Sequence, residues 1–541
     1  MINVKRMSIV AVILVLTAAF VFAGGTSQSA GSGTATAAPN SNFNPTGYPI
    51  VKQKITLTAF GNQNVTHKDW NDVYCFTEYE KKSNIHIEWT QVPNQGFAER
   101  KNVLLASGDY PDFFYRCAFS VSDIINYGSK GAFIRLNDLI DQYGVNVKAR
   151  MQELPDMAKS MKMPDGNIYT LPSRSLSTES AVQLNWINKV WLDRLGLQVP
   201  ASLDEIEAVL TAFKTRDANG NGNPNDEIPY SDRNNGNSIF DSTYGAFGMG
   251  SLSNSQFPNY IDLGPDGKVR LFAISDNFRQ QLEWITKLYS NGLLDPEMFT
   301  QDIPTFTAKG EQDLIGAFFA NNSPEIIGAK HTNDYVTAPP PKGPSGQAVF
   351  NNTGPTFGIG PFAISNKNKY PAETMRWIDF YYSEEGATML WLGPEGITWA
   401  RQPDGSRRVT ALITNNPNGL NAPQSIGQYA IGWAGGGCPV FATDEMEKAR
   451  LPQILYTSYD IVKPFIKVAA MPILSFTTAE QNELNPINDD MITYINEAKV
   501  QFVTGRRPLS QWDAYVRDIK NMGADRYVAI YQAAYDRFAG K

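Results

Sequence analysis

Residues 55–60, Ile55-Thr56-Leu57-Thr58-Ala59-Phe60, alternate apolar and polar side chains, as a β-strand with one buried face does. A helical pattern then runs from Trp70 to Lys82, and a second strand pattern follows at 85–89. Strands that alternate with helices at this spacing indicate parallel βαβ units. This stretch therefore predicts an α/β fold.

The same alternation continues along the chain, with a helical pattern at 97–107 and a short apolar strand at 112–115. In parallel sheets, ligands bind beyond the carboxyl ends of the strands. The loops that follow the first and third strands are therefore the first candidate ligand contacts. Asn62, Gln63 and Tyr115 are the residues we expect there.

The chain is too long for one hydrophobic core, because about 490 residues follow position 50 and single cores stop growing below that size. We therefore expect two or more lobes. The composition is that of a globular protein, with 42% hydrophobic and 19% charged residues. The net charge is −7 and no Lys/Arg-rich run occurs, which argues against a nucleic-acid partner.

The N-terminus is typical of a secretory signal peptide. Lys5 and Arg6 precede an apolar run at 7–22, and cleavage after Ala23 fits the small residues there. An uncleaved membrane anchor is the alternative. No Cys follows the run, which argues against a lipid-modified protein. Residues 24–50 are Gly-, Ser-, Thr- and Ala-rich and predict a flexible linker. We expect a periplasmic or extracellular protein.

The residues that usually carry catalysis are sparse. Only three His occur, at 67, 86 and 331, and no nucleophile elbow, dinucleotide fingerprint or phosphate loop is present. We therefore expect no enzyme. The three Cys are expected to be buried thiols, and a Cys75–Cys117 disulfide is the alternative in an oxidising compartment.

Residues 217–227 form the most specific motif: Asp217-Ala218-Asn219-Gly220-Asn221-Gly222-Asn223-Pro224-Asn225-Asp226-Glu227. Oxygen-bearing side chains alternate, a Gly stands sixth and two acids close the loop, as Ca²⁺ with its six to eight oxygen ligands requires. A polar surface turn is the alternative. We predict a structural calcium ion held by Asp217, Asn219, Asn221, Asn223 through its carbonyl, Asp226 and Glu227.

Aromatic residues are abundant, with 10 Trp and 24 Tyr. Trp191, Trp284 and Trp377 stand at helical spacing among apolar residues and are expected in the core. Trp399 and Trp433 stand in Gly-bounded segments instead. These two are the candidates for stacking on sugar rings.

Several segments together resemble the extracellular solute-binding protein family 1 of ABC importers, closest to its branch of alginate-oligosaccharide-binding proteins. The resemblance runs from about Lys54 to the C-terminus and includes the calcium loop. The segments that carry it are 105–112, 136–140, 165–172, 191–197, 382–386 and 502–505.

This resemblance implies a type 2 periplasmic-binding-protein fold: two α/β lobes with a hinge and a central cleft that holds the solute. By similarity, lobe one comprises 51–178 and 360–400, and lobe two comprises 179–359 and 401–541. Where relatives commonly have Ile-Arg-Lys-Asp-Trp-Leu, this chain has Asn188 in place of the Arg. That difference suggests an uncharged ligand.

The resulting hypothesis is a monomeric solute-binding protein that captures a carbohydrate, in particular an oligosaccharide, and delivers it to the permease of an ABC importer. A secreted carbohydrate-active enzyme and a sugar sensor or adhesin with the same fold are the alternatives. The sequence does not name the sugar.

Overall fold

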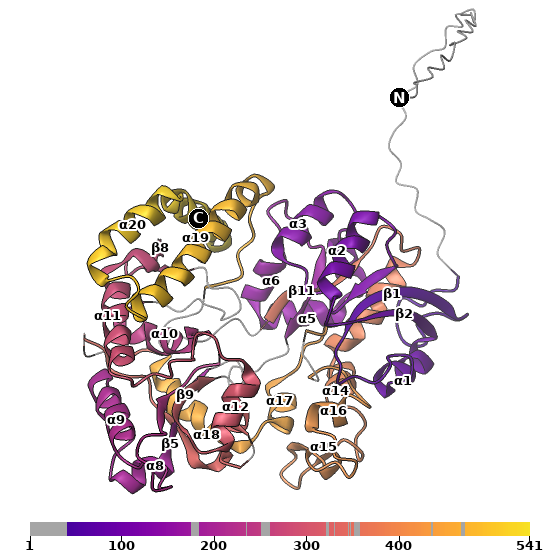
Figure 1. Cartoon of the computed structure of the whole chain (residues 1–541). Coiled ribbons are helices and arrows are strands. Elements are labelled where there is room, and N and C mark those ends of the chain that lie inside the picture. Colours follow the sequence, from indigo (N-terminus) through magenta and orange to yellow (C-terminus); the bar gives the residue numbers. More distant parts are fainter. Residues whose placement is uncertain are drawn as a thin grey trace, which may run out of the picture. The chain divides into compact units, whose positions relative to one another are not determined.

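The computed structural model describes residues 41–541, except 175–182, 234, 250–259, 321–323, 329, 345, 347, 351–356, 434–436 and 467–470. The predicted signal peptide at 1–23 and the linker residues 24–40 lie outside the described residues. Two separate sheets, each covered by helices, organise the rest (Figure 1). The predicted α/β architecture is confirmed.

The first sheet has five strands in the order β2-β1-β3-β11-β4. Strands β1, β2 and β3 are mutually parallel, and β11 pairs antiparallel with β3 and with β4. The strands are β1 (Ile55–Gln63), β2 (Ile85–Pro93), β3 (Phe113–Tyr115), β4 (Thr170–Arg174) and β11 (Phe357–Ile364). The helices of this part are α1 (Tyr74–Ser83), α2 (Phe97–Ser107), α3 (Val121–Ser129), α4 (Asn137–Tyr143), α5 (Val145–Glu153), α6 (Pro155–Met161), α13 (Pro371–Asp379) and α14 (Glu384–Trp391).

The second sheet has four strands in the order β10-β5-β9-β6. Strand β5 is antiparallel to both of its neighbours, and β6 is parallel to β9. The strands are β5 (Leu184–Asn188), β6 (Ile228–Tyr230), β9 (Ile315–Ala320) and β10 (Tyr335–Ala338). Its helices are α8 (Lys189–Leu195), α9 (Leu203–Thr215), α10 (Asn237–Thr243), α11 (Asp276–Ser290), α12 (Ile303–Glu311), α18 (Gln453–Val462), α19 (Thr478–Val503), α20 (Trp512–Asn521) and α21 (Ala524–Ala539).

Two small hairpins and three short helices complete the described elements. The hairpins are β7 (Ile261–Leu263) with β8 (Val269–Leu271) and β12 (Trp399–Arg401) with β13 (Arg407–Val409). The helices are α15 (Ala411–Thr414), α16 (Ala422–Ile426) and α17 (Asp444–Arg450).

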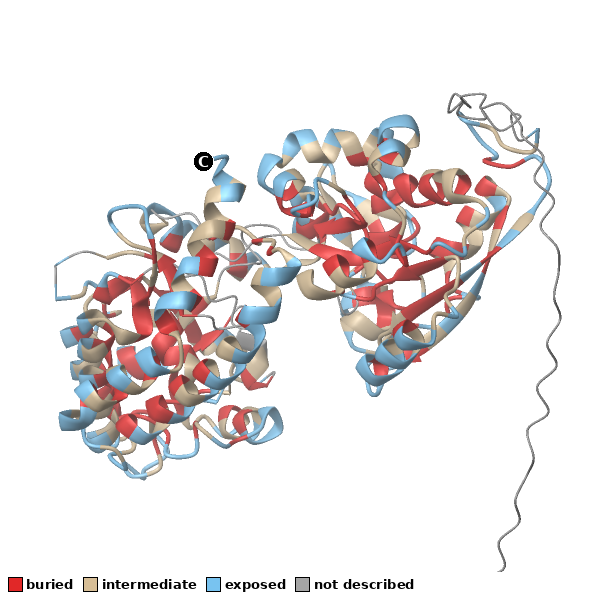
Figure 2. Cartoon of the chain, turned by 90° about the horizontal axis from the view of Figure 1, so that it is seen from above, coloured by how far each residue is buried: buried red, intermediate tan, exposed pale blue. Residues whose placement is uncertain are grey.

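The first sheet lies within one large core, the strands of the second sheet divide their side chains between two further clusters, and buried residues concentrate along the strands (Figure 2). As predicted, Trp377 and Trp191 are core residues, with 2% and 0% of their surface exposed. Trp284 is only partly buried and packs against the second core. Apolar strands sandwiched by helices account for most of this burial, which stabilises each part.

Two expected boundaries need correction. The C-terminal end of the expected linker is ordered: Ile50 is fully buried, and the Arg376 guanidinium donates to the carbonyls of Asn44 and Gly47. Residues 401–449 were assigned to lobe two, yet Ile431, Val440 and Ala449 pack in the first core. The buried contacts of this segment therefore place it with the first sheet.

One edge of the first sheet is where the chain leaves for the second sheet. Strand β4 ends at Arg174 just before that crossing, and β11 begins at Phe357 just after the return crossing. Because β1, β2 and β3 run in the same direction as β4, their last residues, Gln63, Pro93 and Tyr115, lie at this same edge. We call it the crossing edge of the first sheet.

The second sheet also has a crossing edge. Strand β5 begins at Leu184 after the first crossing, and β10 ends at Ala338 before the return crossing; the chain crosses a third time after Ala449. Strands β6 and β9 run antiparallel to β5, so they end at this edge, at Tyr230 and Ala320. The opposite edge, where β5 ends and β6, β9 and β10 begin, is called the outer edge.

Candidate functional site

Two predicted ligand residues lie at the crossing edge of the first sheet. Asn62 and Gln63 are the last residues of β1 and are partly exposed. The Asn62 amide donates to the Val92 carbonyl over 3.4 Å, and the Gln63 amide donates to the Lys68 carbonyl over 3.3 Å. Each amide has two N–H donors and a carbonyl oxygen with two lone pairs, so both side chains can still form hydrogen bonds to a ligand.

The third residue expected there, Tyr115, is fully buried. Its ring packs edge-to-face against Trp70 and Trp89, with ring centres 5.7 and 5.4 Å apart. Burial raises the pKa of its phenol well above the usual value. Tyr115 is at the predicted end of its strand but points into the core, which corrects its expected role as a ligand contact.

The residue after Tyr115 is a better candidate that the sequence reasoning missed. Arg116 has a left-handed backbone, with φ 56°, and its buried guanidinium donates to the Asn62 carbonyl over 2.7 Å. Ala118 is also left-handed, with φ 46°. Such conformations are costly for residues with a Cβ and cluster at functional sites. In the sequence, the only feature that pointed to Arg116 was its position directly after a predicted strand.

The predicted stacking face of Trp399 is not open. Trp399 is 3% exposed, and its indole N–H donates to the Gly393 carbonyl over 3.0 Å. The guanidinium carbons of Arg401 and Arg407 lie 5.7 and 5.3 Å from its ring centre. The two arginines of its own hairpin therefore lie against the indole within cation–π distance, and the ring offers no exposed face to a sugar.

Trp433 packs against the first core, not against the second as expected. It is only partly buried, and the guanidinium carbon of Arg450 lies 5.3 Å from its ring centre. Its indole N–H is buried and has no hydrogen-bond partner among the described residues. A buried Trp N–H usually finds a partner, so this donor is available to a ligand.

Asp232 is a second functional candidate missed from the sequence, at the crossing edge of the second sheet. It follows β6 and is 1% exposed. Its carboxylate accepts the Ser238 backbone N–H over 2.7 Å and the Ser238 hydroxyl over 2.9 Å. The Gln301 amide donates to the Asp232 carbonyl and to the Ser231 hydroxyl. This network fixes charged and polar groups beyond the end of a strand, where ligands bind.

A buried lysine lies beside this network. The Lys499 ammonium, on α19, donates to the Asn237 side-chain oxygen over 2.7 Å and lies 4.8 Å from the Phe240 ring centre. Burial lowers the pKa of Lys499 to about 8, and the carboxylates of Asp241 and Asp232 oppose this shift. Its ammonium is therefore kept charged at neutral pH at an energetic cost.

Lys499 should contribute stability that rises with pH between about 8 and 9.5, opposite in sign to the contribution of the three buried thiols, whose pKa values burial raises. Its folded pKa of about 8 lies below the ordinary value of 10.5, so in this window the unfolded chain binds the extra proton. This contribution should increase the free energy of unfolding by about 1 kcal/mol per pH unit and should be constant below pH 8. Urea unfolding of the wild type and of Lys499→Met at pH 7.5, 8.5 and 9.5 tests it. The difference in free energy of unfolding between the two proteins should change with pH by that amount in favour of the wild type, and a difference that does not depend on pH would refute the assignment.

The predicted calcium loop lies at the outer edge of the second sheet, directly before β6. Asp217, Asn219 and Asn221 side-chain oxygens accept the backbone N–H groups of Gly222, Asn221 and Asn223 over 2.8–3.0 Å. Gly220 and Gly222 are left-handed, with φ 74° and 90°. Glycine adopts such positive φ angles without steric cost, so the backbone can turn sharply and direct the side-chain oxygens inwards.

The carboxylates of this loop fit a cation. Glu227 is 3% exposed, and one of its oxygens accepts the Ala218 N–H over 2.8 Å. Its other oxygen and Oδ1 of Asp217 are buried without a hydrogen-bond partner among the described residues. Asp226 accepts the Asn219 and Asn221 amides. Buried carboxylate oxygens without partners are costly, and a hard divalent cation would satisfy them.

Asn188 was taken to face the ligand, and the structure corrects this. It is fully buried at the end of β5, at the outer edge, and caps α8 by accepting the Trp191 N–H over 3.1 Å. The argument for an uncharged ligand from this residue therefore fails, because the crossing edge is at the other end of the strand.

Comparison with known proteins agrees with this architecture. A model of the bacterial extracellular solute-binding protein family matches residues 67–388. The fructooligosaccharide ABC transporter substrate-binding protein FusA of Streptococcus pneumoniae serotype 4 (strain ATCC BAA-334 / TIGR4) is 29% identical over 547 residues, which cover 99% of this chain and 98% of FusA.

Solved structures show the same relationship. FusA in complex with kestose has a TM-score of 0.75 and 30% identity, and covers 90% of this chain and 100% of its own. An EF-hand mutant of FusA in complex with fructo-nystose gives the same values. A solute-binding protein of a human-milk-oligosaccharide (HMO) transporter from Bifidobacterium longum infantis has a TM-score of 0.77 at 23% identity, covers 89% of this chain and 99% of its own, and shares the fold.

These relatives are binding proteins of transporters. Among the helices that the structure describes, none is both long and apolar enough to cross a membrane. The family match covers more than half of the chain, and the two sheets with their crossing edges are the architecture that the resemblance implied. The chain belongs to the bacterial extracellular solute-binding protein family.

Proposed function

We propose that this protein captures an oligosaccharide of the fructooligosaccharide class and delivers it to the permease of an ABC importer. The observation that carries the proposal is the similarity to FusA along almost the whole chain. The crossing edges supply suitable chemistry, since sugar hydroxyls need both donors and acceptors once buried. On one sheet the Asn62 and Gln63 amides offer both and the Arg116 guanidinium offers donors; on the other sheet the Asp232 carboxylate offers acceptors.

The mechanism follows from differential binding. The chain crosses between its two lobes at the same edges that carry these polar groups, so a ligand at the crossings contacts both lobes only when they close. The ligand then shifts an open–closed equilibrium towards the closed state. The permease recognises that closed state, and an empty protein is therefore a poor partner for it.

The first experiment is a thermal-shift screen of the purified protein with kestose, nystose, a maltooligosaccharide and an oligogalacturonate. Kestose and nystose should raise the melting temperature, because a ligand at about 100 times its dissociation constant adds about 2.7 kcal/mol to stability. The other two sugars serve as the controls for size and charge. If none of the fructooligosaccharides shifts the melting temperature while another sugar does, the proposed ligand class is wrong.

We propose in addition that the loop at 217–227 holds one structural Ca²⁺. The buried carboxylate oxygens of Asp217 and Glu227 support this, and so does the existence of an EF-hand in FusA, of which a mutant has been solved. Asp217, Asp226 and Glu227 would supply charge, and Asn219, Asn221 and the Asn223 carbonyl would complete the oxygen ligands. The ion would brace the start of β6 and takes no part in ligand binding, since the loop lies at the outer edge.

A further inference from the structure

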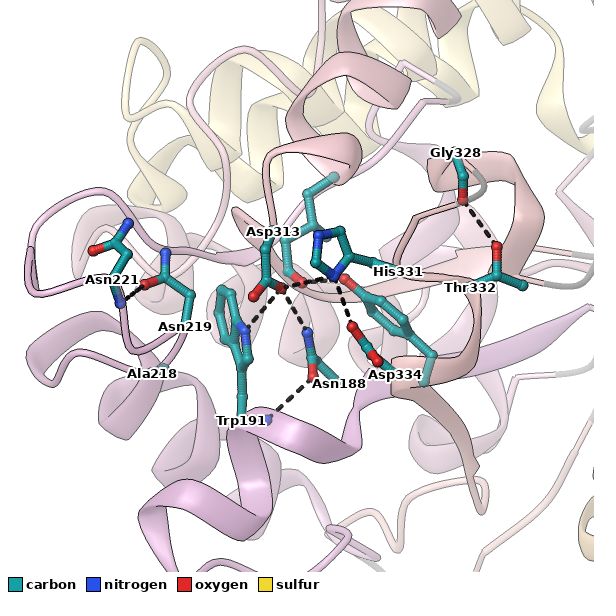
Figure 3. Close-up of polar contacts among 12 residues, drawn as sticks. Asn188, Trp191, Ala218, Asn219, Asn221, Asp313, Gly328, His331, Thr332 and Asp334 are labelled. Atoms are coloured by element: carbon teal, nitrogen blue, oxygen red, sulfur yellow. Dashed lines mark hydrogen bonds and ion pairs between the residues drawn. The ribbon is translucent and has the colours of Figure 1, made fainter.

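Three further side chains that can bind a metal converge at the outer edge of the second sheet (Figure 3). Nδ1 of His331 lies 2.7 Å from Oδ2 of Asp334 and 4.0 Å from Oδ1 of Asp313. The ligand atoms of the three residues all lie within 4.8 Å of one another. None of the three belongs to the loop at 217–227 or to a crossing edge.

Separate segments of the fold bring these residues together. Asp313 lies between α12 and β9 and has a left-handed backbone, with φ 56°. Asp334 directly precedes β10, and His331 directly precedes the single-turn 3₁₀ helix Thr332–Asp334. Because β9 and β10 both begin at the outer edge, the sheet itself sets the spacing between the two carboxylates.

The Asp313 carboxylate is held in place by two N–H donors. The Asn188 amide donates to its Oδ1 over 3.2 Å, and the Trp191 indole donates to the same oxygen over 3.1 Å. Figure 3 shows both donors pointing at Asp313 from the start of α8. Such outer donors orient a carboxylate ligand and are a regular part of metal sites.

The charge of this group is unbalanced without a cation. In the part of the chain that the structure describes, His331 is the only basic side chain that forms an ion pair with Asp313 or Asp334. His331 itself is mostly buried, with 15% of its side chain exposed. With a neutral imidazole, the group carries two negative charges at a partly buried site, and charges of this kind are normally paired or bound to a metal.

We propose that Asp313, His331 and Asp334 bind a divalent transition metal of the Zn²⁺ class, with Asn188 and Trp191 as positioning residues. One imidazole nitrogen and two carboxylate oxygens suit Zn²⁺, whereas Ca²⁺ takes oxygen ligands alone. Two ligand atoms that each lie about 2.0–2.2 Å from a tetrahedral ion are about 3.4 Å from each other. This separation falls between the 2.7 Å from Nδ1 of His331 to Asp334 and the 4.0 Å from the same atom to Asp313. The metal would tie the starts of β9 and β10 together, and water would fill the remaining position.

Binding of Co²⁺ tests the proposal, because Co²⁺ replaces Zn²⁺ and absorbs visible light when bound in such a site. The full protein, without a polyhistidine tag and with millimolar Ca²⁺ present to saturate the 217–227 loop, is titrated with Co²⁺. One equivalent should bind with a visible absorption band. His331→Gln and Asp334→Asn should weaken binding at least tenfold and abolish the band.

His86→Gln is the matched control, since Nδ1 of His86 pairs with a single carboxylate, Glu80, at 2.8 Å. This variant should bind Co²⁺ as the wild type does. Zn²⁺ should also raise the melting temperature of the wild type and of Asp217→Ala, and not that of His331→Gln. Far-UV circular dichroism and the Ca²⁺-dependent melting shift confirm that His331→Gln is folded. Absence of a bound equivalent in the wild type, or equal affinity in folded His331→Gln, overturns the site.

Discussion

Asp217→Ala should lose the stabilisation that Ca²⁺ gives the wild type, about 3 kcal/mol at a Ca²⁺ concentration near 100 times the dissociation constant. The reason is that the 217–227 loop brings buried carboxylates together, and Oδ1 of Asp217 is one of the two buried oxygens of the loop that have no hydrogen-bond partner in the described part of the chain. Without the Asp217 carboxylate, the ion has one negative charge and one oxygen ligand fewer. Differential scanning calorimetry with Ca²⁺ or with chelator, together with metal analysis, measures the effect.

Asn225→Ala is the matched control, because Asn225 is an exposed residue of the same loop outside the proposed ligands. It should keep both the bound calcium and the melting temperature. Oligosaccharide affinity should be unchanged in Asp217→Ala wherever the fold persists, since the loop lies at the outer edge. If Asp217→Ala retains calcium and melts with the wild type, the loop is an ordinary polar turn.

Trp399→Ala should lower the free energy of unfolding by about 3–5 kcal/mol, the usual cost of deleting a large buried aromatic side chain. The indole is almost fully buried, donates to the Gly393 carbonyl and lies beside two guanidinium groups. Its loss should leave a cavity beneath the hairpin of β12 and β13. Urea unfolding measures the stability, and calorimetry with kestose measures whether affinity changes in protein that remains folded.

Trp433→Ala is the comparison. Trp433 is only partly buried and its indole N–H has no hydrogen-bond partner among the described residues, so its removal should cost less stability and should weaken sugar binding more than Trp399→Ala does. From the sequence alone, Trp399 was expected to stack on a sugar ring. A Trp399→Ala protein with wild-type stability and affinity weakened tenfold or more would restore that earlier expectation.

The first three strands of the first sheet could be predicted from the sequence, although β1 and β2 end later than expected. The polar residues after Phe60 were predicted to be a loop, yet β1 continues to Gln63 in register with β2, where Asn62 pairs with Val92 and Gln63 with Pro93. Backbone hydrogen bonds between neighbouring strands, which side-chain alternation does not report, extend the ladder.

The candidate site was less predictable, because its residues depend on what packs around them. Arg116 is significant only through its left-handed backbone and its contact with Asn62, 54 positions earlier. Trp399 stands in a Gly-bounded segment that suggested exposure, and the arginines of its own hairpin cover it instead. The calcium loop was easier to recognise, because all its candidate ligands lie within one short, local motif.

The strand order of the first sheet has a consequence for how the protein is made. Strand β11 lies between β3 and β4, although it follows β4 by about 180 residues in the chain. In a chain that folds as it emerges outside the membrane, β3 and β4 therefore stay unjoined until β11 has emerged. Over that interval both have unpaired edges that can associate with other chains. A holdase chaperone that shields such edges during biogenesis would protect this protein when it is most prone to aggregate.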